Sequence, residues 1–206
     1  RRAHVVLGFG LAALLSAGGS RAQTSDGQPV NRPSAARRVV QQFDFEPNSR
    51  EVFELPRYWD MAQDGAKGVG ARPGNPAWNT AALDENFAYA GKGSLKLSTK
   101  GGSTCLRLEP GVIAVFPGTD YLVSARIQTR GMPNARAAIT ARYLDKANTP
   151  IAGASSRSEL VATQPDEWKL VTVPLSGAVA SAAYIQIDLE LLQPERFEQS
   201  TLDKHQ

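Results

Sequence analysis

The sequence predicts an all-β protein, and three observations lead to this prediction. Residues 182–191 read AAYIQIDLEL, in which apolar side chains at positions 185, 187, 189 and 191 alternate with polar ones. Successive strand side chains point to opposite faces, so this alternation is typical of a strand with one buried face. The same alternation recurs in several segments bounded by Gly, Pro, Asn and Asp. No helical pattern separates these segments, which favours a two-sheet sandwich over a parallel α/β fold.

Each expected strand is a short run of alternating or apolar residues. We expect strands at residues 39–45, 51–55, 94–99, 105–109, 121–129, 136–143, 158–163, 168–175 and 182–191. Residues 64–86 contain five glycines and prolines within their first eleven positions, so they predict an irregular excursion. Residues 145–150 have turn composition and predict a hairpin between two of the strands.

The N-terminal segment has the features of an export signal. Two arginines are followed by an apolar run at residues 5–15, and Ser20 and Ala22 fit the small-residue rule for cleavage after Ala22. The apolar run is shorter than the roughly 20 residues that a membrane span needs. We therefore expect a signal peptide at residues 1–22, an exported protein and no membrane span.

The remaining chain divides into three parts. Residues 23–38 are rich in polar residues and Pro and predict a disordered linker. Residues 39–192 contain the expected strands and predict one sandwich domain. Residues 193–206 are polar and more helix-like, and no strand is expected there, so we expect them to begin a continuation of the natural protein, such as a C-terminal domain.

Charge and cysteine content limit the range of possible functions and of covalent cross-links. Three of the 23 basic residues lie in residues 1–22, so the rest of the chain has 20 basic and 20 acidic residues. This balance argues against nucleic acid as a partner. Cys105 is the one cysteine, so an exported domain would have no internal disulfide. It lies in a strand pattern that suits a small buried side chain.

The order of several short motifs resembles the jelly-roll carbohydrate-binding modules of the galactose-binding-like superfamily, especially those attached to cellulases and xylanases. The motifs are Phe45-Glu46, Trp59, the step Gly91-Lys92-Gly93-Ser94-Leu95-Lys96-Leu97, Tyr121, Tyr143-Leu144-Asp145 and Trp168. The resemblance covers roughly residues 39–192, and the Asp-Asp-Val strand that closes these modules is absent. It implies a jelly-roll β-sandwich in which Trp168 is buried.

The resemblance also implies a function and a metal site. Such modules bind polysaccharide without catalysis and target a linked domain to it. Many hold a structural calcium, and the resemblance places Glu46 among its ligands with carbonyl groups near Lys92. The closing-strand acid is missing, so Glu46 is equally open to being a surface residue.

Sugar recognition requires aromatic faces for the ring and planar polar groups for the hydroxyls. In and near the excursion the aromatic and amide candidates are Trp78, Trp59, Tyr58 and Asn79. On the polar strand faces the candidates are Arg126, Gln128, Arg142, Gln186, Asp188 and Glu190. The sequence leaves open whether Trp59 and Trp78 only stabilise the fold, and whether the polar faces are ordinary solvent faces.

Catalytic side chains are scarce. Beyond residue 22 the one histidine is His205, outside the strand pattern, so no Ser-His or Cys-His pair and no histidine-based zinc site is expected. We therefore expect a chain that is not an enzyme. Two alternatives stay open: a structural or protein-interaction sandwich that packs against a C-terminal catalytic domain, and a jelly-roll polysaccharide lyase or hydrolase with paired carboxylates.

Overall fold

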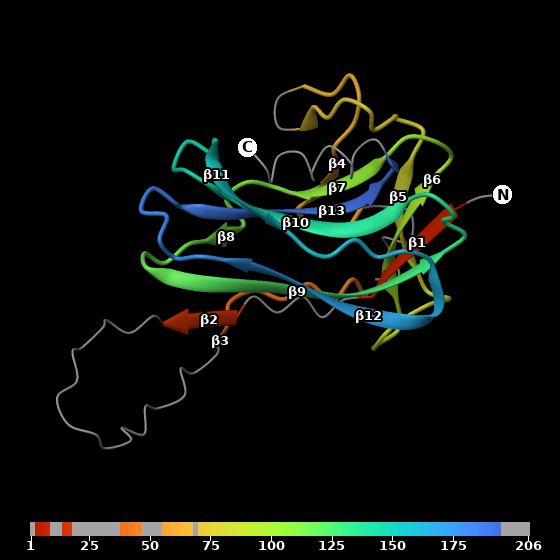
Figure 1. Ribbon diagram of the computed structural model, residues 1–206, viewed down its shortest axis with the longest axis horizontal. Coiled ribbons are helices and arrows are strands. Elements are labelled where there is room, and N and C mark those ends of the chain that lie inside the picture. Colours follow the sequence, from red (N-terminus) through yellow and green to blue (C-terminus); the bar gives the residue numbers. More distant parts are fainter. Residues whose placement is uncertain (1–2, 9–13, 18–37, 47–54, 68–69, 195–206) are drawn as a thin grey trace, which may run out of the picture.

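The computed structural model of the chain consists of two antiparallel sheets that face each other (Figure 1). It describes residues 3–8, 14–17, 38–46, 55–67 and 70–194. All elements in this part of the chain are strands. The prediction of an all-β protein is therefore confirmed.

The seven-stranded sheet, called sheet A, has β9 (Thr119–Arg130) at its centre. One edge of β9 pairs with β12 (Gln164–Leu175), and the other edge pairs with β1 (Ala3–Gly8) and β2 (Leu14–Ala17) in succession. β1 also pairs with β6 (Ser94–Thr99), which pairs with β5 (Thr80–Asp84). β3 (Arg38–Val39) pairs with β2.

The six-stranded sheet, called sheet B, is built around β13 (Tyr184–Leu192). β13 pairs along one edge with β10 (Arg136–Leu144), which pairs with β11 (Pro150–Arg157). Along its other edge β13 pairs with β7 (Thr104–Leu108) and β8 (Ile113–Ala114). β4 (Trp59–Met61) pairs with the outer edge of β7.

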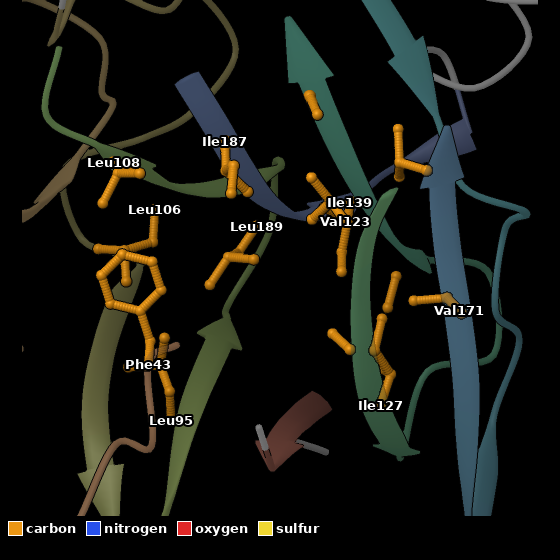
Figure 2. Close-up of a cluster of buried hydrophobic side chains, with 14 of the residues drawn as sticks. Phe43, Leu95, Leu106, Leu108, Val123, Ile127, Ile139, Val171, Ile187 and Leu189 are labelled. Atoms are coloured by element: carbon orange, nitrogen blue, oxygen red, sulfur yellow. The ribbon is translucent and has the colours of Figure 1, made fainter. Parts of the chain in front are cut away.

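The hydrophobic core lies between the two sheets. Figure 2 shows side chains of sheet B, among them Leu106, Ile139 and Leu189, near Val123 and Ile127 of sheet A. All five are fully buried. Burying such side chains between two sheets is the main favourable contribution to folding, at about 1.5–3 kcal/mol for each large aliphatic side chain. The alternation seen in the sequence thus corresponds to the inner face of each sheet.

Several strand boundaries differ from the prediction. Residues 40–46 are not a strand, although Phe43 and Phe45 are buried against Trp59. The strand predicted at 158–163 lies earlier in the chain, as β11. The turn before it ends at Thr149, because the Asp145 carboxylate accepts hydrogen bonds from the backbone amides of Ala147 and Thr149. β11 lies at the edge of sheet B and lacks a clear apolar alternation, so the sequence pattern did not reveal it. β5 was also missed, inside the predicted excursion.

The predicted signal peptide overlaps two strands of sheet A. β1 makes five residue pairs with β6 and five with β9, which places it between these two strands (Figure 1). Several predicted segments lie outside the described part of the chain. They are residues 1–2, 9–13 and 18–22 of the predicted signal, most of the predicted linker, the predicted strand 51–55 except Leu55, and residues 195–206. In that part, no helix is long and apolar enough to cross a membrane.

Removal of residues 1–22 is expected to destabilise the domain. β6 and β9 would lose their common neighbour, and each backbone hydrogen bond contributes about 1 kcal/mol net. The free energy of unfolding in urea should therefore fall by several kcal/mol in a chain that begins at Gln23. Equal unfolding curves for the two chains would show that β1 and β2 contribute nothing to stability, as expected of a removable signal.

Candidate functional site

The outer face of sheet B carries four of the predicted site residues. Along β13, Gln186, Asp188 and Glu190 point away from the core, and Arg142 lies beside them on β10, in register with Gln186. The sequence pattern suggested a solvent face. Instead, Gln186, Asp188 and Glu190 are 3%, 0% and 1% exposed. The excursion covers them, because part of residues 62–79, drawn in orange and yellow in Figure 1, lies over this face.

Asp188 is the centre of a buried ion network. Its carboxylate accepts hydrogen bonds from Arg107 Nε and Nη2 at 2.8 and 2.9 Å, from Arg142 Nη2 at 2.6 Å and from Arg72 Nη1 at 2.9 Å. Arg72 belongs to the excursion, 116 residues away in sequence. The contact therefore fastens the excursion to sheet B.

Glu190 extends the network along the same strand. Its carboxylate accepts hydrogen bonds from Arg72 Nη2 and from Thr140 Oγ1, the latter at 2.7 Å. Arg157 Nε lies 3.4 Å from it. Two buried carboxylates thus meet four arginines, and every one of these guanidinium groups has at least one acidic partner. We call Arg72, Arg107, Arg142, Arg157, Asp188 and Glu190 the sheet B ion network.

The ion network lowers the pKa of Asp188, whereas the pKa of the neighbouring Cys105 thiol is raised. Burial alone would raise the pKa of Asp188, but the hydrogen bond from Arg107 and the charges of Arg142, Arg107 and Arg72 lower it below its usual value. Burial raises the pKa of the Cys105 thiol well above its usual value, and the charge of Asp188 adds to this. Arg72 Nη1 lies 2.7 Å from Cys105 Sγ. Cys105 is thus a buried thiol, as the sequence predicted, and is unsuited to attack as a thiolate.

A metal ion does not fit this cluster. Cys105, Asp188 and Glu190 could each offer one ligand atom, and these atoms lie within 4.8 Å of one another. However, both carboxylates already accept hydrogen bonds from guanidinium groups, and the thiol is protonated. A divalent cation would have to displace the arginines and stay beside their positive charges. The arrangement therefore serves the structure of sheet B.

Glu46, the predicted calcium ligand, accepts a backbone hydrogen bond. Its two carboxylate oxygens lie 3.1 and 2.9 Å from the Lys92 amide nitrogen. Gly91 has φ +74°, and a Cβ there would lie 1.6 Å from Glu46 Oε1, so this contact requires glycine. Within the described ranges, no group of three acidic, Cys or His side chains includes Glu46. The resemblance placed Glu46 near Lys92 correctly, but the partner is an amide N–H and the calcium remains a prediction.

The aromatic candidates of the excursion do not form a common surface. Trp78 is 62% exposed, whereas Asn79 beside it is buried and donates to the carbonyls of Gly101 and Ser103 at 2.9 and 3.0 Å. Trp59 is 2% exposed and makes edge contacts with the rings of Phe43 and Phe45. Its ring therefore belongs to the core.

Tyr58 lies at the surface next to Trp59. It is 38% exposed, and the Arg57 guanidinium lies 4.6 Å from its ring centroid. This pair borders a hollow of about 230 Å³ near Phe43 and Glu46. Of the four predicted residues in this region, Trp78 and Tyr58 thus present ring surface to solvent.

The two remaining predicted residues, Arg126 and Gln128, lie on the other sheet. Both are on β9 and point away from the core, because they alternate with Ala125 and Ile127, which are buried in the core. The predicted polar residues are therefore divided between the outer faces of two sheets, and no single site contains them all.

Arg126 lies in a cluster with two aromatic rings that come from distant segments. Its Cζ lies 4.8 Å from the centroid of the Tyr89 ring, and Tyr89 makes an edge contact with Trp168 at 6.0 Å between centroids. Tyr89 is 47% exposed and Trp168 is half-buried. Leu170, in register with Arg126, is 48% exposed beside them.

A second arginine repeats this arrangement on the same strand. Arg130 Cζ lies 4.0 Å from the centroid of the Phe87 ring. Phe87 and Tyr89 both belong to the loop between β5 and β6, so this loop places two rings against two cations of β9. We call Phe87, Tyr89, Arg126, Arg130 and Trp168 the aromatic–arginine cluster.

Sequence reasoning missed most of this cluster. Trp168 was expected in the core, but it alternates with the inner side chains of β12 and so shares the outer face with the exposed Leu170, where it contacts Tyr89. Tyr89 and Phe87 were not considered. The signal that could have found them is the alternating Phe87-Ala88-Tyr89 next to a glycine-rich turn, since loops often carry binding residues.

Comparisons with known proteins do not identify a family for this chain. No family model and no curated protein matches the chain. A similar solved structure is the enzymatically active domain of tailspike protein 4 of bacteriophage CBA120, at 14% identity and a TM-score of 0.49. The match covers 69% of this chain and 18% of that one, so this chain corresponds to a small part of the tailspike domain.

This finding corrects one expectation. We expected a chain that is not an enzyme, whereas the solved domain that it resembles is enzymatically active. The expectation that the chain is not an enzyme is therefore withdrawn. The specific family of jelly-roll carbohydrate-binding modules is not identified by these comparisons either.

Replacing Asp188 by Asn is expected to lower the free energy of unfolding by about 3–5 kcal/mol, because it removes the charged carboxylate that three partly buried arginines share. Urea unfolding of Asp188→Asn measures the change. The matched control is Asp166→Asn, which removes an exposed carboxylate and should change stability by less than about 0.5 kcal/mol. A loss below about 1 kcal/mol for Asp188→Asn would contradict a stabilising network.

The same network predicts a dependence of stability on pH. Because the folded-state pKa of Asp188 is lowered, its contribution is present above its unfolded pKa of about 3.9 and is lost as pH falls through the folded value. The difference in stability between the wild type and Asp188→Asn should therefore be largest near neutral pH and shrink below about pH 4. Urea unfolding at several pH values tests this, and a constant difference would contradict it.

Proposed function

We propose that this β-sandwich binds polysaccharide, and that the aromatic–arginine cluster on the outer face of sheet A is its contact surface. The observation that carries the proposal is the exposed ring of Tyr89, held between the ring of Trp168 and the guanidinium of Arg126. Aromatic rings supply apolar faces for the C–H groups of a sugar, and guanidinium and amide groups supply hydrogen bonds for its oxygens.

The contrast between the two sheets supports this choice of face. On sheet B the polar side chains are buried, are bonded to one another and lie under the excursion, so few of their donors are free for a ligand. On sheet A the cluster combines exposed apolar surface with polar groups of β9. Arg126, which was predicted from the sequence, belongs to this cluster, and this supports the choice of sheet A.

The wider role follows from the sequence features. The apolar N-terminal segment behind two arginines supports export with β1 and β2 kept in sheet A, which would bring the domain to polysaccharide outside the cytoplasm. Binding of this kind raises the local concentration of any linked domain at the same polymer. The resemblance to jelly-roll carbohydrate-binding modules supports the same role.

Replacing Tyr89 or Trp168 by Ala is expected to weaken polysaccharide binding about 5- to 30-fold, since an aromatic contact contributes about 1–2 kcal/mol. Affinity gel electrophoresis against a panel of neutral and acidic polysaccharides measures the effect. Trp78→Ala is the matched control, because it removes a more exposed ring outside the cluster. Circular dichroism of each variant checks that the fold is kept.

The outcomes of this experiment separate the candidate surfaces. Loss of binding in Trp78→Ala alone would move the site to the excursion and contradict the choice of sheet A. Binding to no polysaccharide by the wild-type chain would contradict the proposed function.

A second function is favoured by a separate apolar patch. Val39 and Phe116 are 50% and 56% exposed, and both line a hollow of about 360 Å³ together with Arg38 and Val40. Exposed apolar side chains around a hollow are typical of protein contacts. A structural role, in which the sandwich packs against another domain, would use this patch and would leave the chain without affinity for polysaccharide.

A further inference from the structure

The aromatic–arginine cluster contains two positive charges without acidic partners. In the described part of the chain, ion pairs are formed by Arg72, Arg107, Arg142 and Arg157 of the sheet B ion network, but neither Arg126 nor Arg130 takes part in one. Each of the latter two is instead held over an aromatic ring, at 4.8 and 4.0 Å. Two fixed guanidinium groups on one strand face therefore lack a counter-charge within the described residues.

The acidic residues near the cluster do not neutralise these arginines. Glu159 pairs with Lys169 at 2.7 Å, and Asp84 pairs with Lys96 at 3.1 Å. Asp166 and Glu167, which precede Trp168 on β12, are exposed and form no ion pair with either arginine. Among the described residues, no acidic side chain neutralises Arg126 or Arg130.

Unpartnered polar atoms lie between and beside the two arginines. Gln128 is 5% exposed, and its Oε1 has no hydrogen-bond partner among the described residues. Arg130 Nε is also buried, with no partner in the same part of the chain. Gln128 Oε1 needs a donor such as a hydroxyl group, and Arg130 Nε needs an acceptor such as a carboxylate. Buried polar atoms are usually paired, so these two atoms could take partners from a ligand that lies against β9.

The spacing of the arginines indicates a polymer. Arg126 and Arg130 are four residues apart on one strand, so their Cα atoms are separated by about 13 Å. This distance is longer than one sugar ring. If each guanidinium group meets its own negative charge, the ligand carries such charges on more than one of its units.

We infer that the polysaccharide is acidic, and that uronate carboxylates meet Arg126 and Arg130 while the sugar rings lie against Tyr89 and Trp168. The planar fork of a guanidinium group matches the two oxygens of a carboxylate. Uronate chains also offer hydroxyl donors for Gln128. This inference rests on the proposed function and adds to it the chemical class of the polymer.

The test compares polygalacturonate with its carboxyl-reduced, neutral counterpart, using the chain of residues 1–206 and isothermal titration calorimetry. Wild-type protein should bind polygalacturonate at least about tenfold more tightly, and the difference should shrink as salt rises. Arg126→Gln combined with Arg130→Gln should abolish the preference while keeping residual binding to the neutral polymer. Arg57→Gln is the matched control, because it removes an arginine that lies over a different tyrosine.

Each outcome bears on the inference separately from the proposed function. Equal binding of the two polymers, or an equal loss in Arg57→Gln, would overturn the acidic assignment and leave polysaccharide binding intact. Tighter binding of dextran sulfate than of polygalacturonate would overturn the choice of carboxylate. If the wild-type protein binds neither these polymers nor any neutral polysaccharide, both the inference and the proposed function are overturned. Unfolding curves of the variants establish that each is folded.

Discussion

The buried carboxylates of Asp188 and Glu190 decide which face of this sandwich is open. A carboxylate without a partner is too costly to bury, so each one in sheet B is surrounded by arginines. One of these arginines, Arg72, comes from the excursion and brings it down over β13. The outer face of sheet B is thereby used for structure, and the outer face of sheet A is left for other contacts.

The two faces use the same residue types for opposite purposes. On sheet B, each of four arginines forms an ion pair with a buried acid of the same chain. On sheet A, arginines lie over aromatic rings, a contact that fixes their position without neutralising their charge. Counting arginines on strands therefore does not distinguish a structural cluster from a binding surface. The partner of each guanidinium group makes the distinction.

The sequence predicted the central strands of the sheets better than the edge strands. The alternation of β9, β10 and β13 was recognised because their inner side chains are all buried in one core. The edge strand β11 and the short strand β5 lack that pattern and were misplaced or missed. Trp59 illustrates the same limit for single residues. The sequence left open whether its ring binds sugar or stabilises the fold, and the structure shows Phe43 and Phe45 enclosing it in the core.

The sequence by itself determined the fold class, because a period of two in apolar residues is a local property that each strand carries independently. It also placed Arg126 and Gln128 on one face of one strand. Only the tertiary structure decided that Asp188 and Glu190 are buried, since the arginine that covers them lies 116 residues from Asp188. It alone brought Tyr89 to Trp168 as well, because a contact between a loop and a distant strand depends on how the sheet is assembled.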